Sequence, residues 1–224
     1  AWVARIVLYD CVELGENQSY AYEQLVVTTA EGEGEVVIDS QLQSCGGLGA
    51  YGLDVRFWSP SSRHFFYTNA REGAPDGCGY WEQPLIRVDT TDWRTLFLGG
   101  GPRSPDGKLL ATWGDRTLHV WDIDEGEVGQ IEAADPGLEV GPIAWSPDSQ
   151  ALVYIENAAF CPVSGPSVVV RVDLPSLTTT ELWRSPEMGY GAAEWASAGA
   201  VYLTDGSGQV WTLDLATGQI QPGS

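Results

Sequence analysis

The sequence predicts an all-β fold made of about five repeated four-stranded antiparallel sheets, of which the first is incomplete. A phrase around Ser-Pro-Asp recurs along the chain as FWSPSSRHFFYTN, PRSPDGKLLATWGD and AWSPDSQALVYIE. Its copies stand 45 and 42 positions apart, counted from Ser59 to Ser104 and from Ser104 to Ser146. Repeats of this length are typical of solenoids and propellers. No segment shows the period of an amphipathic helix, so every repeat is expected to be built of strands.

Each repeat has the same order of short strands. An apolar strand ends in an aromatic residue, and the Ser-Pro-Asp-Gly variant after it suits a type I turn. A second strand, such as HFFYTN or ALVYIEN, closes on Asn or Asp, and a third, such as VVVRVD, ends at an aspartate. A weaker fourth strand follows. A degenerate copy, EWASAGAVYLTDG, carries the pattern into the last unit, so we expect strands A to D throughout.

The N-terminal segment fits strands B to D of the same unit, without a complete strand A. ARIVLYD matches strand B, YEQLVVTTAEG matches strand C, and GEVVIDSQL matches strand D. A lone four-stranded sheet cannot bury both of its faces, so stacking of the sheets around an axis is what forms a core. We therefore expect one β-propeller domain over residues 1–224, with blades at approximately 1–44, 45–99, 100–135, 136–186 and 187–224.

The repeats resemble the TolB-like β-propellers, whose blades carry WSPDG or PD40 repeats. Trp58-Ser59-Pro60 and Trp145-Ser146-Pro147 carry the resemblance, which covers residues 51–221 and, more weakly, residues 1–50. It implies structural roles for the repeated Trp, Pro and Asp residues. It implies no particular activity, because such propellers serve as accessory, sensory and gating modules.

Charge and composition exclude several classes of function. The chain has 31 acidic and 11 basic residues and a net charge of −20, so nucleic acids and anionic membrane surfaces would be repelled. No apolar run is long enough to span a membrane. The acidic excess serves either solubility or attraction of a basic partner. The start at Ala1, without Met, leads us to expect an exported protein that has lost its leader, in an extracellular or periplasmic compartment.

The cysteines are even in number and widely spaced, which favours two disulfides and an oxidising compartment. They form no C-x-x-C pair and the chain has two histidines, so a zinc site is not supported. Three lie in long insertions between strands B and C and one in the first D–A connector, so all four are expected at one end of the propeller. Cys11–Cys45 with Cys78–Cys161 is the favoured pairing of three possible ones, and free thiols stay an alternative: the residues are Cys11, Cys45, Cys78 and Cys161.

Aromatic residues accompany the cysteines at this loop-bearing end. Exposed Tyr and Trp are favoured anchors for proteins, peptides and sugars. The alternative is that they pack the long loops onto the blades. The predicted partner-binding residues are Tyr51, Tyr80, Trp81, Phe160 and Tyr190.

No catalytic set is found in the sequence. G-x-S-x-G and H-E-x-x-H are both absent, and His64 and His119 lie on strands, where a structural role accounts for them. The acidic stretch at residues 122–127 lacks the alternation of ligands of a calcium loop. Asp54 and Glu194 are the nearest to a pair of carboxylates, and both fit the lining of a hydrated channel. We expect no metal and no cofactor.

The sequence therefore predicts a non-catalytic, exported propeller whose loop-bearing and cysteine-bearing end binds a protein or peptide partner, alone or within a larger assembly. Two alternatives stay open. One is a glycan-binding module that uses Tyr51, Tyr80, Trp81 and Tyr190. The other, by resemblance to the prolyl oligopeptidase group, is the propeller domain of a larger hydrolase whose catalytic domain lies outside this chain.

Overall fold

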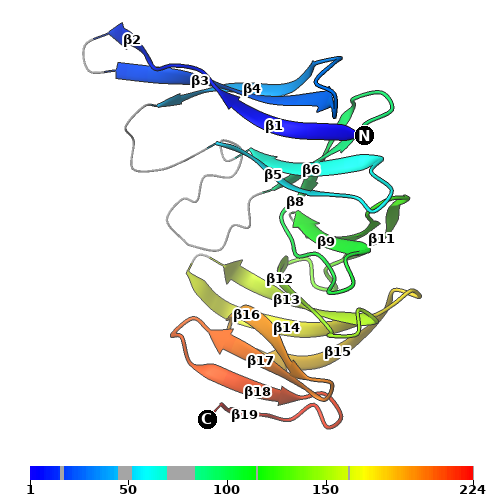
Figure 1. Cartoon of the computed structure of the whole chain (residues 1–224). Helices are drawn as coiled ribbons and strands as arrows, with labels where there is room; N and C mark the ends of the chain where they lie inside the picture. The colour runs from blue at the N-terminus through cyan, green and yellow to red at the C-terminus, as the bar shows by residue number, and fades with distance from the viewer. Residues whose placement is uncertain (16–17, 45–51, 70–83, 115, 161, 224) are drawn as a thin grey trace. The chain divides into compact units, whose positions relative to one another are not determined.

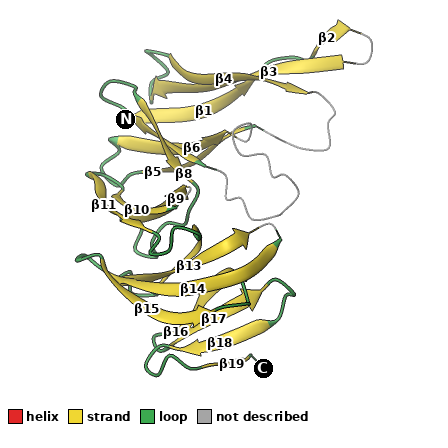
Figure 2. Cartoon of the chain, turned by 180° about the vertical axis from the view of Figure 1, so that it is seen from behind, coloured by secondary structure: helices red, strands yellow, loops and turns green. Residues whose placement is uncertain are grey.

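A computed structural model of the protein describes residues 1–224 except 16–17, 45–51, 70–83, 115, 161 and 224. The described residues form strands joined by turns and loops, with no helix among them (Figure 2). Accordingly, this part of the chain contains no helix of the length and hydropathy that crossing a bilayer requires. The chain divides into two compact units, one ending at Leu98 and the other beginning at Gly99. The predicted all-β fold with five antiparallel sheets is confirmed.

The first unit holds two sheets (Figure 1). In the first sheet, strands β1 and β4 flank β3 in antiparallel register, and β2 pairs with the far end of β3. β1, β3 and β4 are the expected strands B, C and D, and the described residues place no strand A beside β1. The second sheet has all four strands, in chain order. The bounds are β1 Trp2–Leu8, β2 Val12–Gly15, β3 Gln18–Thr29, β4 Val36–Ser44, β5 Leu53–Trp58, β6 His64–Asn69, β7 Leu85–Asp89 and β8 Thr95–Gly99.

The second unit holds three sheets, each with its strands in chain order. The third sheet of the molecule contains β9 to β11, the fourth β12 to β15, and the fifth β16 to β19. Their bounds are β9 Leu109–Gly114, β10 Thr117–Asp122, β11 Gly126–Glu132, β12 Glu139–Trp145, β13 Ala151–Phe160, β14 Val163–Asp173, β15 Thr178–Ser185, β16 Tyr190–Ser197, β17 Ala200–Asp205, β18 Val210–Asp214 and β19 Ile220–Pro222.

The third sheet departs from the expected four strands. Its strand A is reduced to two isolated bridges, Gly100 with Trp113 and Arg103 with Leu110. Pro102 has no N–H to give to a ladder. Gly101 has a φ of 155°, and a Cβ there would collide with a backbone carbonyl of β9. The Gly-Gly-Gly-Pro sequence before the turn therefore holds this segment against β9 without forming a regular strand.

The Ser-Pro-Asp-Gly turns are closed as the sequence predicts. The Gly107 N–H donates to the Ser104 carbonyl oxygen at 2.9 Å. The Ser104 hydroxyl donates to Asp106 at 2.7 Å and accepts the N–H of Leu109 at 2.9 Å. The fourth turn residue has a positive φ, 75° at Gly107, which suits glycine because it has no Cβ. The turn therefore fixes the residue at which strand B begins and its register with strand A.

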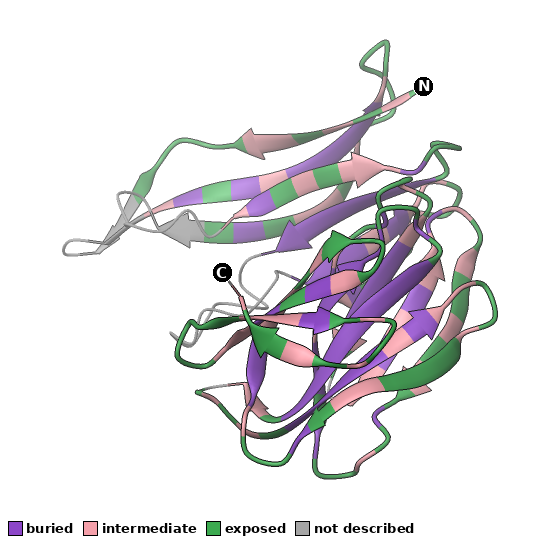
Figure 3. Cartoon of the chain, turned by 90° about the horizontal axis from the view of Figure 1, so that it is seen from below, coloured by how far each residue is buried: buried purple, intermediate pink, exposed green. Residues whose placement is uncertain are grey.

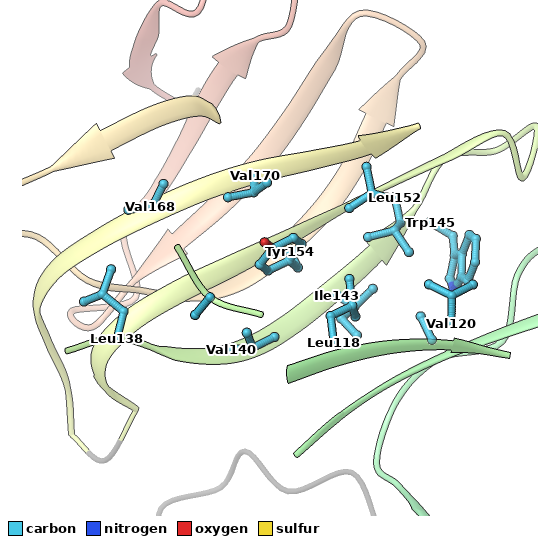
Figure 4. Close-up of a cluster of buried hydrophobic side chains, with 13 residues drawn as sticks. Leu118, Val120, Leu138, Val140, Ile143, Trp145, Leu152, Tyr154, Val168 and Val170 are labelled. Atoms are coloured by element: carbon cyan, nitrogen blue, oxygen red, sulfur yellow. The ribbon is translucent and has the colours of Figure 1, made fainter. Parts of the chain in front are cut away.

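Buried side chains fill the space between successive sheets within each unit. Figure 4 shows one such cluster, in which Leu118 and Val120 of β10 face Trp145 of β12 and Leu152 of β13. A second cluster joins the fourth sheet to the fifth, and a third joins the two sheets of the first unit. β13 is apolar on both faces because Leu152 faces one cluster and Val153 the other. This is the packing expected of a propeller blade between two neighbours.

Candidate interaction surface

Two of the five predicted partner-binding residues lie in the described part of the chain, and neither is a free anchor. The other three and three of the four cysteines lie outside the described residues, so the predictions that rest on them stay predictions. Those residues are Tyr51, Tyr80, Trp81, Cys45, Cys78 and Cys161. Cys11 is exposed and disulfide-bonded. The favoured pairing with Cys45 stays a prediction.

Tyr190 opens β16 and is 1% exposed. The side-chain amide of Asn157 donates to its carbonyl oxygen at 2.6 Å and accepts its N–H at 3.3 Å. Burial raises the pKa of the Tyr190 hydroxyl. The expectation of an exposed anchor is thereby corrected: the ring lies in the cluster between the fourth and fifth sheets, where side chains of β13, β14, β17 and β18 surround it.

Phe160 stands at the end of β13, where it pairs with Val163. Its ring lies directly over Gly141 of β12, where a Cβ would overlap it. The partly buried ring therefore fastens the long β13–β14 hairpin to β12. The geometry at Phe160 therefore agrees with the alternative to a binding role, in which the aromatic residue packs a long loop onto its blade.

Both histidines lie where a structural role accounts for them. His64 is 3% exposed on β6, with its Nε2 3.4 Å from the Asp89 carboxylate. The Nδ1 of His119 lies 2.8 Å from the Glu127 carboxylate, and its ring stacks on Trp121 with centroids 5.8 Å apart. Each ring therefore joins neighbouring strands of its own sheet.

The two carboxylates that the sequence singles out both lie at exposed positions. Asp54 is exposed and pairs with Arg56 at 3.2 Å, and Glu194 is exposed on β16. No three acidic, histidine or cysteine side chains come together in the described part of the chain as a metal site would require. A groove of about 210 Å³ lies beside the Arg171–Asp173 ion pair and Trp195. Its volume is below that of ordinary small-molecule sites, which hold about 300 Å³ or more.

The aspartates of the repeated turns are held as anions by their own turns. The Ser104 hydroxyl and then the Lys108 N–H lower the pKa of Asp106. The hydroxyl of Ser146 and the N–H of Gln150 lower the pKa of Asp148 in the same way. Hydrogen bonds to the charged form favour it. These carboxylates therefore organise backbone, as the resemblance to PD40 repeats implies for them.

Six exposed apolar side chains lie among polar ones, such as Arg5 and Gln24, on the outer face of the first sheet, opposite the face that packs on β5–β7. We name this group of six the first-sheet patch. Its residues are 41–57% exposed. Its members are Val3, Tyr9, Val12, Tyr22, Val37 and Leu42.

Strand register places these residues on one face. The Tyr9 N–H donates to the Tyr22 carbonyl oxygen at 2.8 Å, and Tyr22 is paired with Leu42 across β3 and β4. Val12 pairs with Tyr20, two positions from Tyr22. Residues two apart on a strand share a face. The β2–β3 hairpin therefore carries the patch past the end of β1, as Figure 1 shows for these strands.

The two tyrosines of the patch support one another. Their ring centroids are 5.9 Å apart at a tilt of 46°, within the range of favourable aromatic pairs. The Tyr9 hydroxyl donates to the Gln24 side-chain oxygen at 2.9 Å. The two tyrosines thus present apolar rings with polar tips beside aliphatic side chains, and tyrosine is a favoured anchor in protein interfaces.

The sequence prediction missed this surface and placed the binding residues in the long loops. One signal was available. A sheet with one solvated face alternates apolar and polar residues, whereas Leu25-Val26-Val27 and Val36-Val37-Ile38 are apolar on both faces. Such runs indicate that the outward-facing residues of the sheet are apolar as well as the inward-facing ones.

No family model matches the sequence, and no curated protein sequence matches it either. Among solved structures, dipeptidyl peptidase 4 of Porphyromonas gingivalis is 9% identical, covers 91% of this chain and 38% of its own, and has a TM-score of 0.52.

Two further structures have lower TM-scores. TolB of Acinetobacter baumannii is 12% identical, covers 99% of this chain and 57% of its own, and has a TM-score of 0.44. The dihydro-heme d1 dehydrogenase NirN, in complex with DHE, is 17% identical, covers 63% of this chain and 32% of its own, and has a TM-score of 0.43. The chain thus spans between about a third and three fifths of the length of these proteins. The likeness concerns fold alone, and with the five antiparallel sheets it makes this chain a β-propeller with an incomplete first blade.

Proposed function

We propose that this chain is a non-catalytic interaction module, exported from the cell, that binds a protein or peptide partner. The observation that carries the proposal is the first-sheet patch, which gathers exposed aliphatic and tyrosine side chains on an ordered sheet. The patch includes the first B–C hairpin, so it reaches the loop-bearing end to which the sequence assigns binding. The net charge of −20 favours a neutral or basic partner.

Site-specific photo-crosslinking in cells that produce the protein tests the proposal. Benzoylphenylalanine is placed at Tyr22, which is 41% exposed in the patch, or at Tyr202, which is 43% exposed on the fifth sheet. The two positions match in residue type and exposure, so Tyr202 is the control. We expect a discrete partner adduct from position 22 that Val37→Glu diminishes, because a charge in a desolvated apolar contact weakens it.

Two outcomes would contradict the proposal. Adducts of equal yield from positions 22 and 202 would show that the crosslinked proteins contact the chain without preferring the first-sheet patch. Absence of an adduct from both positions, in cells where the protein is folded and abundant, would remove the patch as a binding site.

A second candidate is the propeller domain of a larger hydrolase. It is favoured by the fold likeness to a dipeptidyl peptidase, of which this chain covers 38%. The test is the reading frame that encodes these residues. An α/β-hydrolase sequence in the same frame would support this candidate, and its absence would exclude it.

A further inference from the structure

The groove of about 210 Å³ lies where the fourth and fifth sheets meet, at the turns that join strands A and B. The fourth sheet lines it with its Ser-Pro-Asp turn and with Arg171 of β14, and the fifth sheet lines it with Trp195 and Ala198. The buried residues of these sheets lie along the strands, whereas Asp148, Gln150 and Ala198 of the turns are exposed (Figure 3). The groove is therefore accessible to a ligand from solvent.

The corresponding junction between the third and fourth sheets is bridged by a serine. The hydroxyl of Ser149 accepts the N–H of Asp106, in the preceding turn, at 3.1 Å. In the fourth sheet the Leu174 N–H donates to the carbonyl oxygen of the residue after Ser149. In the fifth sheet the Leu215 N–H donates to that of the residue after Ala198, so Ala198 holds the position of Ser149.

The fifth turn cannot make the same bridge. Alanine has no hydroxyl, so Ala198 offers no side-chain acceptor to Asp148, which follows its Ser-Pro as Asp106 does in the preceding turn. The fifth turn is also shorter by one residue, counted from its tryptophan to the first paired residue of strand B. The missing hydroxyl and the shorter turn together account for the groove at this junction.

The polar side chains of the groove keep hydrogen-bonding capacity for a ligand. Asp148 uses its Oδ1 to accept the Ser146 hydroxyl at 2.6 Å and the Gln150 N–H at 3.0 Å. Arg171 uses its Nε and Nη2 to bind Asp173 at 2.8 and 2.7 Å. Among the described residues, Oδ2 of Asp148 is left as an acceptor and Nη1 of Arg171 as a donor.

Trp195 places an aromatic ring beside these donors and acceptors. Such a combination suits a ligand with several hydroxyls around an apolar face, and a sugar ring has that chemistry because each hydroxyl both donates and accepts. A tyrosine or serine side chain would bring a single hydroxyl. A cavity of about 150 Å³ can hold a benzene ring. The groove therefore has room for one saturated ring and is too small for larger ligands.

We propose that the groove between Asp148, Arg171 and Trp195 binds a neutral pyranose residue. One sugar hydroxyl takes the place that the Ser149 hydroxyl has in the preceding junction, where it accepts the N–H of the turn aspartate. The Asp148 carboxylate and the net charge of −20 disfavour acidic sugars. The inference goes beyond the proposed function and does not rest on it, because the groove belongs to the second unit and the first-sheet patch to the first.

Two-dimensional ¹H–¹⁵N NMR of the full chain, titrated with simple sugars, tests the inference. The probes are the methyl pyranosides of glucose, galactose and mannose. We expect at least one of them to shift the Asp148 amide and the Trp195 indole N–H in a saturable manner. Glucuronic acid should bind at least fivefold more weakly than the corresponding neutral sugar, because its carboxylate meets the negative potential of the chain.

Substitutions in the turns separate this site from others. Ala198→Ser restores the hydroxyl that the preceding junction has, so it should raise the Kd of the sugar at least tenfold by occupying the place of a ligand hydroxyl. Ala216→Ser is the matched control, because Ala216 is an exposed turn residue of the same sheet that does not line the groove. Gln150→Ala, which removes an exposed amide, should raise the Kd about two- to tenfold, the effect of one hydrogen bond.

Several results would overturn the inference. Absence of saturable shifts with all three sugars would refute it, and shifts of equal size in Ala198→Ser would place the sugar elsewhere. Equal binding of glycerol would show that hydroxyls bind without recognition of a ring. Tighter binding of N-acetyltyrosinamide would assign the groove to a side chain of a polypeptide.

The two proposals fail separately. Loss of sugar binding with the Tyr22 adduct retained would refute the sugar site alone. Sugar binding without an adduct would refute the protein-binding role of the first-sheet patch alone.

Discussion

Ser62 and Ser149 hold the last position of their turns with a φ of 60°, where the middle copy of the phrase has Gly107. A residue with a Cβ pays about 1–2 kcal/mol in this left-handed region, and glycine does not. Ser62 is exposed, whereas Ser149 is buried and its hydroxyl accepts the Asp106 N–H at 3.1 Å. The same backbone conformation therefore has different consequences at the two positions.

Ser62→Gly should raise the free energy of unfolding by about 0.5–1 kcal/mol. Glycine relieves the strain of the positive φ, and the entropy that it adds to the unfolded chain offsets part of this gain. Ser149→Gly gains the same relief and loses the hydrogen bond from Asp106, so it should be neutral or destabilising. Urea unfolding of both variants measures the difference. Equal stabilisation by both would show that the Ser149 bond contributes nothing.

The turn aspartates give the fold an acid-sensitive contribution. Serine hydroxyls lower the folded-state pKa values of Asp106 and Asp148. Such groups stabilise the fold above their unfolded pKa of about 3.9, and this contribution is lost as the pH falls through the lower folded values. Asp106→Asn with Asp148→Asn should therefore destabilise the protein at pH 7, and by less near pH 2.

Urea unfolding of the wild type and this double variant across pH 2–7 measures that difference. Glu31→Gln removes one exposed negative charge elsewhere and is the control for the change in net charge. A difference between wild type and double variant that stays constant over the whole range would contradict the prediction.

At the scale of the element, the tryptophan of the repeat connects one blade to the previous one. The Trp145 indole N–H donates to the Pro102 carbonyl oxygen at 2.9 Å, and the Trp195 N–H donates to the Ala144 carbonyl oxygen at 2.8 Å. Each bond joins the strand A regions of successive repeats, which have no other ladder between them. The resemblance implied a structural role for this tryptophan, and these bonds specify it.

Trp145→Phe should lower the free energy of unfolding by about 2–4 kcal/mol, because a carbonyl loses its donor and a buried ring leaves space behind. Trp211→Phe is the control: its N–H donates to Asp205 at 2.9 Å within a single sheet, so its loss breaks no bond between blades. Far-UV circular dichroism in urea measures both. A smaller loss at Trp145 than at Trp211 would contradict a connecting role.

At the scale of the whole molecule, the second unit contains its own cores. The clusters between the third, fourth and fifth sheets are formed entirely by residues from Leu109 onward. In repeat folds, stability is approximately the sum of the repeats and of the interfaces between neighbours. A fragment of residues 99–224 keeps three sheets and both of these interfaces.

This fragment, with Cys161→Ser, should fold on its own with an all-β circular dichroism spectrum and one cooperative urea transition. A shorter fragment, residues 136–224, loses the strands β9–β11 and with them one interface, so it should unfold at lower urea. An unfolded 99–224 fragment would show that the second unit depends on the first.

The predicted pairing of the cysteines also concerns the whole chain, because it links residues far apart in the sequence. Peptide mapping without reduction should recover Cys11–Cys45 and Cys78–Cys161 as linked pairs. The second link would join the two halves of the sequence and survive cleavage between them, whereas reduction would release it. Four alkylatable thiols in the native protein would contradict the exported reading.

The sequence predicted much of the fold and little of the binding surface. Ser104-Pro105-Asp106-Gly107 sets a turn by local chemistry, and alternating apolar residues mark the strands beside it, so strand order could be read directly. The reduction of strand A in the third sheet was missed because the pattern of the other repeats outweighed Gly101 and Pro102. Tyr190 was misjudged because exposure is not a local property.

By itself the sequence determined the repeat, the turns and the all-β class, because hydrogen bonding within four residues and side-chain alternation are short-range. Only the tertiary structure decided that Tyr190 is enclosed and that Tyr9 and Tyr22 lie side by side. These depend on which sheet covers which face and on pairing between residues far apart in the chain, and no local pattern carries that information.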